Sequence, residues 1–316
     1  MQTLIDAARN GKEVTVVVEL MARFDEEANI NWAARLEEVG AHVVYGVVGH
    51  KTHAKMAMVV RREEGRLVRY VHLGTGNYHA RTARFYTDFD LLTCREAICA
   101  DVNEVFQQLT GLGKATKLRH VWSSPFTLHT RILESIEAAA RTAKAGKPAR
   151  ITAKMNALLE PQVIEALYKA SQAGVKVELV VRGVCALRPG VAKLSENIRV
   201  RSIIGRFLEH TRIFHFRHGG ESTVYLSSAD WMDRNFFRRI ELCFPLLDQK
   251  LKRRVIREGL KPYLEDNVQA WDMAPDGTFH RARRGRGEAH CAQVELLKLL
   301  AKPPGTDGPK KTKKAT

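Results

Sequence analysis

Apolar runs alternate with amphipathic segments at the start of the chain, and the amphipathic segments end at glycine. Gly11 and Gly40 each follow a helical pattern and precede a valine-rich run. Glycine in that place suits the left-handed C-cap of a helix that leads into a strand. The pattern therefore predicts a helix at 4–10, a buried strand at 13–19, a helix at about 26–38 and a strand at 42–48.

The same plan returns in the second part of the chain. Its glycines, Gly146 and Gly174, are 28 residues apart, and Gly11 and Gly40 are 29 residues apart. The elements expected in this copy are a helix at about 128–145, a strand at 150–154, a helix at about 160–173 and a strand at 175–182. This internal repeat of alternating helices and strands predicts an α/β fold of two related domains.

Each copy then places a histidine in a strand-like run, with a cation two residues further on. The pairs are His53 with Lys55 in KTHAKMAMVV and His210 with Arg212 in LEHTRIFHF. A further strand in each copy ends in a small polar turn, GTGN at 74–77 and SSAD at 227–230. The second copy has about 23 more residues between its glycine and its histidine, and they include loop-like stretches at 188–190 and 195–197.

The spacing of the histidine and the cation carries the candidate chemistry. Side chains two residues apart on a strand share one face, so His53 and Lys55 would point into one pocket. The lysine favours neutral imidazole, the nucleophilic form, and would hold an incoming phosphate. An isolated pair of this kind is more often a strand-face histidine beside a solvated lysine. The repeat changes that balance, because two related halves that face each other would bring His53 and His210 to one cleft.

The composition indicates a polyanionic partner. The chain has 51 lysines and arginines against 35 acidic residues, a formal charge of +16 and a pI near 9.8. Nucleic acid, anionic lipid, nucleotide and polyphosphate all fit such an excess. The cysteines lack metal-ligand spacing and are odd in number, which indicates a reducing, cytoplasmic setting; they are Cys94, Cys99, Cys185, Cys243 and Cys291.

The pattern also predicts the domain boundaries. The start shows no signal-peptide core, and no run of about 20 apolar residues predicts a membrane span. A helix and a core strand follow Met1 so abruptly that we expect further sequence upstream, which makes the first domain N-terminally truncated. The expected division is 1–118, 119–275 and a basic, partly disordered tail at 276–316, with a short helix near 293–300.

Longer blocks resemble a known family. The H-x-K pair with its polar turn is similar to the phospholipase D superfamily, whose two halves pool such motifs around one phosphate; the second copy departs from it through Arg212 and SSAD. The chain from about residue 3 to 270 resembles the C-terminal catalytic half of polyphosphate kinase. The blocks that carry this resemblance are ARFDEEANINWAARLEEVG (22–40), GHKTHAKMAMVVRR (49–62), RYVHLGTGNYHARTARFYTDFDLLT (69–93), RGVCALRPGV (182–191), RVRSIIGRFLEHTRIFHF (199–216) and YLSSADWMDRNFFRRIE (225–241).

The resemblance implies roles for single residues. His53 would be phosphorylated on its imidazole, and His210 would contact nucleotide phosphate across the cleft. Tyr86 would pack on adenine, and Arg182 would contact nucleotide phosphate. Arg23 matches a position at the magnesium and phosphate site, although a cation cannot itself ligate Mg²⁺ and would bind phosphate beside it. From the internal repeat, and not from the resemblance, we expect Lys55, Asn77, Asp230 and Arg239 to line the pocket.

Taken singly, three of these residues have simpler explanations. Arg23 could pair with Asp25 or Glu26 at a helix start, Arg182 could be a solvated strand end, and Tyr86 could be a core or cross-strand tyrosine.

The implied activity is reversible transfer of the γ-phosphate of ATP to the end of inorganic polyphosphate through a phosphohistidine at His53. Mg²⁺ and ATP/ADP would be the cofactors, and the full-length family implies a homo-oligomer. No specific nucleic acid is expected, while peripheral membrane association stays open. Two alternatives remain: a phospholipase D-like phosphodiesterase or nuclease, and a polyanion- and nucleotide-binding remnant without turnover of its own.

Overall fold

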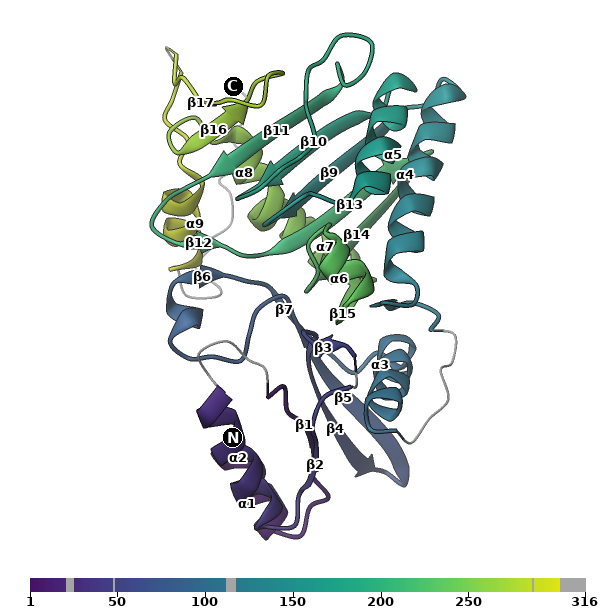
Figure 1. Cartoon of the computed structure of the whole chain (residues 1–316), viewed down its shortest axis with the longest axis vertical. Coiled ribbons are helices and arrows are strands. Elements are labelled where there is room, and N and C mark those ends of the chain that lie inside the picture. The colour runs from purple at the N-terminus through teal and green to yellow at the C-terminus, as the bar shows by residue number, and fades with distance from the viewer. Residues whose placement is uncertain (21–25, 48, 112–117, 286, 302–316) are drawn as a thin grey trace, which may run out of the picture.

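The protein folds into two lobes joined by a shared core and by paired strands (Figure 1). The structure, a computed structural model, describes residues 1–20, 26–47, 49–111, 118–285 and 287–301. We call the elements from α1 to α3 the first lobe and those from β8 to α9 the second lobe. In this part of the chain, no helix is long and apolar enough to cross a membrane.

The first lobe contains a small parallel unit and an antiparallel sheet. Strands β1 and β2 pair in parallel, and α1 and α2 cover them through a cluster around Ile5 and Leu36. Strands β4, β5 and β7 form the antiparallel sheet, on which α3 packs. The elements are α1 (Gln2–Arg9), β1 (Thr15–Val17), α2 (Glu26–Glu37), β2 (His42–Val44), β3 (Lys51–Thr52), β4 (Lys55–Glu63), β5 (Arg66–Gly74), the 3₁₀ turn η1 (Thr82–Arg84), β6 (Tyr86–Thr87), β7 (Asp90–Thr93) and α3 (Glu96–Leu109).

The second lobe is built on a large mixed sheet whose order is β17-β16-β11-β10-β9-β13-β14-β15, with β8 also on β15 and β3 of the first lobe at the end. Helices α4 and α5 cover one face of it (Figure 1). Pro161 at the first turn and the Glu160 carboxylate, which accepts from the Val163 N–H, fix the start of α5.

The bounds of this lobe's elements are β8 (Trp122–Ser124), α4 (Leu128–Lys144), β9 (Ala149–Met155), α5 (Pro161–Gln172), β10 (Lys176–Val181), β11 (Ile198–Ile203), β12 (Leu208–Glu209), β13 (Arg212–His218), β14 (Glu221–Ser227), α6 (Asp233–Phe237), β15 (Arg239–Pro245), α7 (Gln249–Val255), the π-helical η2 (Ile256–Leu260), α8 (Lys261–Glu265), β16 (Ala270–Met273), β17 (Phe279–Arg281) and α9 (Ala292–Leu300).

The α/β class and the internal repeat are confirmed. The parallel unit β1–α2–β2 corresponds to β9–α5–β10, and the antiparallel pair β4–β5 corresponds to β13–β14. The short helix expected near 293–300 is also confirmed, as α9. The domain boundaries at 118 and 275 stay predictions.

Two expected strands are shorter than the sequence suggested. The run at 13–19 forms only β1, which is partly exposed rather than buried because β1 and β2 form a sheet of their own. The strand expected at 42–48 ends at Val44; Gly46 has a φ of 63°, which is outside extended backbone. Val48 lies outside the described residues.

The two lobes exchange short strands. Strand β3 of the first lobe pairs in parallel with β15 of the second, and β12 of the second lobe pairs in parallel with β6 of the first. A hydrophobic cluster also crosses the boundary, with Val71 and Leu73 from one side and Ile213 and Leu242 from the other. The lobes therefore hold each other at the point where the candidate histidines lie.

Candidate active site between the lobes

His53 lies in a break between two strands and not within one. Strand β3 ends at Thr52 and β4 begins at Lys55. The backbone N–H groups of His53 and Ala54 both donate to the carbonyl of Ile240, each at 2.9 Å. The expectation that His53 sits on a regular strand is therefore wrong, because the chain is irregular where the two lobes meet.

A buried carboxylate from the opposite lobe orients His53. Its Nδ1 lies 2.8 Å from Oε2 of Glu241, whose side chain is 0% exposed. The hydroxyl of Ser228 donates to the same oxygen, and the amide of Asn235 donates to Oε1. Burial opposes ionisation of Glu241, but His53, the Lys55 ammonium and the Ser228 hydroxyl bring its pKa below the usual value. An ionised Glu241 places the proton of neutral His53 on Nδ1.

Nε2 of His53 is consequently available to a ligand. Burial, the largest influence, lowers the pKa of His53 to about 4; Glu241 opposes this shift and Lys55 adds to it. The imidazole is therefore neutral at pH 7 and carries its free lone pair on Nε2. Among the described residues, Nε2 has no hydrogen-bond partner, and the side chain retains 19% exposure.

His210 occupies the equivalent place in the second lobe. It lies in the break between β12 and β13, and its Nδ1 is 2.9 Å from Oδ1 of Asp88, a carboxylate of the first lobe. Each histidine is thus oriented by a carboxylate from the opposite lobe. His210 differs at its other nitrogen, because Nη1 of Arg212 lies 3.1 Å from Nε2. Burial, aided by Arg212, lowers the pKa of His210, and Asp88 opposes the shift.

The cations that follow the two histidines share one electrostatic environment. Lys55 begins β4 and Arg212 begins β13. The charge of Arg212 lowers the pKa of His53, and the charge of Lys55 lowers the pKa of His210. Both histidines therefore face a common positive region, as the sequence predicts for a cleft between two repeats.

Lys55 and Arg212 are held very differently. One edge of the Arg212 guanidinium bonds both carboxylate oxygens of Asp230, with Nε 3.1 Å from Oδ1 and Nη2 3.0 Å from Oδ2. Nζ of Lys55 is buried and has no hydrogen-bond partner among the described residues. Burial lowers the pKa of Lys55 to about 7, with Glu241 opposing and Arg212 and Arg239 adding to the shift. An unpaired buried ammonium is costly, so this position is suited to an anionic ligand.

Glycines in the first polar turn leave room for Asp88. A Cβ added at Gly76 would collide with the carboxylate of Asp88, and one at Gly74 would lie 2.5 Å from Oδ1 of Asp90. The hydroxyl of Thr75 donates to Asp88 at 2.7 Å. The turn therefore fixes the carboxylate that orients His210, which explains its need for small residues.

Tyr86 and Arg182 lie at this site. The ring of Tyr86 is 5.0 Å from the ring of His210, centroid to centroid. Arg182 follows β10 directly. Burial and the charge of Arg212 lower its pKa, and Asp230 opposes this shift. The structure thus places Tyr86 beside His210 and Arg182 near the charges of Asp230 and Arg212, while their roles toward a nucleotide stay predictions.

Four other predicted residues fall differently. Asp230 binds Arg212, and the charge of Arg239 acts on Lys55, so both lie at the site. Asn77 is exposed, and its backbone carbonyl accepts from the N–H of His79. Arg23 lies outside the described residues.

A buried polar knot stabilises the His210 half from behind. We give this name to Lys154, Glu209, Thr87 and Gln293. Nζ of Lys154 lies 2.6 Å from Oε2 of Glu209, and both side chains are 2% exposed. Thr87 donates to the same oxygen, and Gln293 donates to Oε1. Glu209 directly precedes His210, and Thr87 directly precedes Asp88. The bond from Thr87 to Glu209 therefore links the backbone segment of His210 to that of Asp88, its orienting carboxylate.

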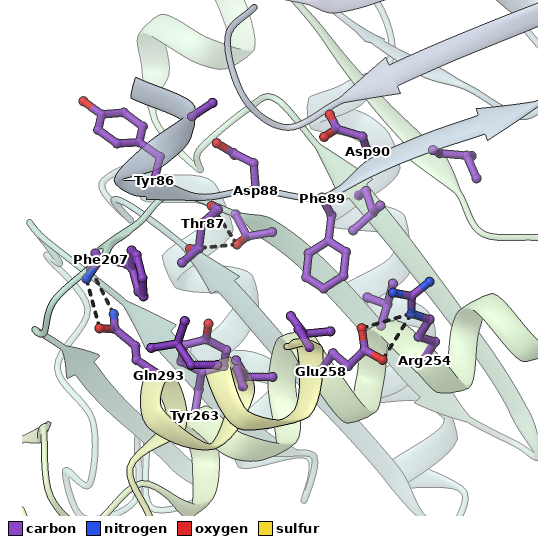
Figure 2. A pocket seen from close by; sticks show the side chains of 18 of the residues that line it. Tyr86, Thr87, Asp88, Phe89, Asp90, Phe207, Arg254, Glu258, Tyr263 and Gln293 are labelled. Atoms are coloured by element: carbon purple, nitrogen blue, oxygen red, sulfur yellow. Dashed lines mark hydrogen bonds and ion pairs between the residues drawn. The ribbon is translucent and has the colours of Figure 1, made fainter. Parts of the chain in front are cut away.

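A cavity of about 720 Å³ lies between the segment 86–90 and the helices at the end of the chain (Figure 2). Figure 2 shows Thr87 and Phe89 pointing into the cavity, while Tyr86 and Asp88 point to the opposite side. The strand-like alternation thus divides the segment into a face toward the histidines and a face toward the protein interior.

The described residues contain no preformed set of ligands for a magnesium ion. No group of three or more histidine, cysteine, aspartate or glutamate side chains in this part of the chain could hold a metal ion. Asp88 and Glu241 are already committed to histidines. Mg²⁺ often depends on only one or two carboxylates and on substrate phosphates.

The fold and the site together define a two-lobed α/β protein in which each repeat contributes one histidine to a shared positive region where the lobes meet. Two family models match the chain: Polyphosphate kinase C-terminal domain 1 over residues 1–115, and Polyphosphate kinase C-terminal domain 2 over residues 121–293. The chain therefore belongs to the polyphosphate kinase family.

Individual relatives agree with this assignment. Polyphosphate kinase of Burkholderia cenocepacia is 68% identical, and that of Paraburkholderia phytofirmans is 65% identical, each over 94% of this chain and 44% of the relative. The crystal structure of polyphosphate kinase from Porphyromonas gingivalis superposes with a TM-score of 0.87 at 36% identity, covering 95% of this chain and 46% of that one. The chain thus spans less than half the length of these relatives.

Proposed function

We propose that this chain carries the catalytic centre of a polyphosphate kinase, which moves the terminal phosphate between ATP and inorganic polyphosphate through a phosphohistidine at His53. One observation carries the proposal. His53 is neutral, its Nδ1 is held by Glu241, and its Nε2 is free beside the unpaired ammonium of Lys55. A nucleophile oriented by a carboxylate next to an anion-binding cation is what covalent phosphoryl transfer requires.

The first half of the reaction follows from that geometry. Nε2 of His53 attacks the γ-phosphorus of ATP, and the bond from that phosphorus to the β,γ-bridging oxygen breaks. ADP leaves with the electron pair of the bond. The ring now carries a positive charge with its proton still on Nδ1, and the Glu241 carboxylate stabilises it. Lys55 and Arg212 stabilise the charge on the phosphoryl oxygens in transit.

The second half uses the same cleft. A terminal oxygen of polyphosphate attacks the phosphorus on Nε2, the P–N bond breaks, and neutral His53 returns. No proton has to enter or leave in either half. The same steps in reverse make ATP from ADP and polyphosphate, since the P–N bond retains high transfer potential.

The nucleotide is proposed to lie toward the His210 half. Tyr86 offers a partly exposed ring face for adenine, and Arg182 and His210 lie beside it for phosphate. Mg²⁺ would arrive on the nucleotide phosphates, with Arg23 as a predicted phosphate contact.

The test is a labelling experiment with γ-³²P-ATP on the purified chain. We expect label on His53 that is labile in acid and stable in alkali, and that is chased into polymer by polyphosphate. Hydrolysis of a phosphodiester without label from ATP would instead identify a phospholipase D-like diesterase. Nucleotide binding with neither label nor hydrolysis would identify a remnant that binds and does not turn over.

A further inference from the structure

A row of cations lies at the end of the second lobe's sheet opposite the catalytic cleft. Arg150 on β9 is paired in register with Lys176 on β10 and with Arg217 on β13. Residues directly opposite on neighbouring strands project from the same face, so three positive side chains stand side by side. Like charges in that relation destabilise a sheet. Glu178 offsets only one of them, through Arg150 at 3.4 Å.

These cations line a hollow of about 530 Å³. Lys147, in the turn between α4 and β9, adds a fourth positive side chain. Gly146 and Gly174 form the two turns at its rim, and a Cβ added at either would meet no atom within 4 Å. The hollow is therefore open to solvent and free of bulky side chains at its rim.

A neighbouring buried histidine lies within the field of two of these charges, Arg150 and Arg217. His215 lies on β13 two residues before Arg217 and bonds the Ser222 hydroxyl at 2.9 Å. Burial, and then Arg217, Arg150 and Lys252, lower its pKa to about 4. A strong positive potential next to an open hollow attracts anions.

We propose that this hollow, which we call the distal cation site, binds the remote part of the phosphate chain whose end lies in the catalytic cleft. The inference rests on the proposed function and extends its substrate site. From Arg150 to Asn156, which bonds Asp230 and the His210 carbonyl, the chain runs along β9. Six residues of strand span about 20 Å, so only a long polymer reaches both places.

The lining favours an inorganic chain over a nucleic acid. The residues that line the hollow include no aromatic side chain, and single-stranded nucleic acids depend on stacking of their bases on such rings. A chain without bases needs only cations at intervals. The lining residues are Ala143, Gly146, Lys147, Pro148, Ala149, Arg150, Ala173, Gly174, Lys176 and Arg217.

The test compares two triple variants that lose the same charge. Lys147→Gln, Lys176→Gln and Arg217→Gln remove the free cations of the distal site and leave the Arg150–Glu178 pair intact. The control, Arg9→Gln, Lys12→Gln and Arg62→Gln, changes exposed cations of the first lobe. Binding of long-chain polyphosphate, tripolyphosphate and a single-stranded oligonucleotide is measured directly, in the His53→Ala background, over a range of salt concentrations.

We expect the distal variant to bind long-chain polyphosphate roughly tenfold more weakly, with the log–log salt slope reduced by about 2 for three lost contacts. Tripolyphosphate binding should change far less. Equal losses in the control, equal losses for long and short chains, or an unchanged long-chain affinity would each overturn the proposal. So would a larger loss for the oligonucleotide than for polyphosphate.

Two features keep this test decisive. The distal triple variant removes repulsion between neighbouring cations, so its thermal unfolding temperature should not fall. If it nevertheless fails to fold, the double variant Lys147→Gln with Lys176→Gln is measured in its place. Binding without a phosphorylatable His53 is independent of transfer. Failure of labelling therefore refutes the proposed function, while unchanged long-chain binding refutes the distal site alone.

Discussion

The two histidine half-sites share one plan and differ at the Nε2 atom of the histidine and in the pairing of the cation that follows it. In both, a histidine sits in a break after a short strand that pairs with the opposite lobe, and a carboxylate of that lobe holds Nδ1. In the first half-site Nε2 is free and Lys55 is unpaired. In the second, Nε2 is engaged by Arg212, which Asp230 holds with two bonds.

This difference teaches how a duplicated site can divide its work. A free Nε2 can become covalently bonded to phosphorus, whereas an occupied one is restricted to orienting and stabilising charge. The cations follow the same division, because Lys55 can gain an anionic partner and Arg212 already has one. The comparison supports the proposal that His53 is the nucleophile and His210 its supporting counterpart.

The largest effect is expected from removing each histidine in turn. His53→Ala should abolish both labelling by γ-³²P-ATP and polymer synthesis, because no other described imidazole has this geometry. His210→Ala should lower turnover by about 10² to 10³ while the fold and residual labelling persist. Acid-labile label on gels and circular dichroism measure these outcomes. Full synthesis by the His53 variant would reverse the assignment.

The next effect separates the two orienting carboxylates. Glu241→Gln can present an amide N–H to Nδ1 and so favour the wrong tautomer, and we expect labelling to slow by about 10³. Asp88→Asn should cost only about tenfold, because Arg212 also holds the His210 ring. Rapid-quench labelling rates give both values. Similar losses in the two variants would mean that the half-sites are not divided as proposed.

The third prediction concerns pH. Labelling should rise as His53 loses its proton, with a pKa of about 4, and fall as Lys55 loses its charge, with a pKa of about 7. Activity is therefore greatest between these values in the enzyme before anions bind. Lys55→Met should lower the rate by about 10² and abolish the falling limb. A falling limb that persists in Lys55→Met would contradict the assignment.

The smallest effect is expected at Tyr86. Tyr86→Ala should raise the nucleotide concentration needed for half-maximal rate by about tenfold, the free energy of one aromatic contact. The requirement for polyphosphate should change little, and Tyr86→Phe should behave like the native chain. Separate titrations of the two substrates show the difference. Parallel increases in both requirements would exclude a stacking role for this ring.

The sequence predicted the repeat because glycine spacing and periodicity are local properties. It also predicted a site shared by the two copies, and the charges of Lys55 and Arg212 do act on both His53 and His210. The orienting carboxylates were missed. Glu241 is 188 residues from His53, and Asp88 is 122 residues from His210, so only the packing of the lobes brings them together. One signal was available, namely a glutamate inside the apolar run IELCF.

The same limit explains the error about the strand around His53. Local pattern favours one continuous strand, but pairing of β3 with β15 from the other lobe breaks it before β4. Where β3 ends depends on its pairing with β15, which is about 190 residues away in the sequence and is invisible to a local pattern.

The polar knot has a consequence for how substrates exchange. Many two-lobed enzymes admit their substrates by swinging the lobes apart. Here such a motion would strip Thr87 from the Lys154–Glu209 pair, break the backbone bonds of β3 and β12, and separate both histidines from their carboxylates. If the proposed function holds, we expect donor and acceptor to exchange without separation of the lobes.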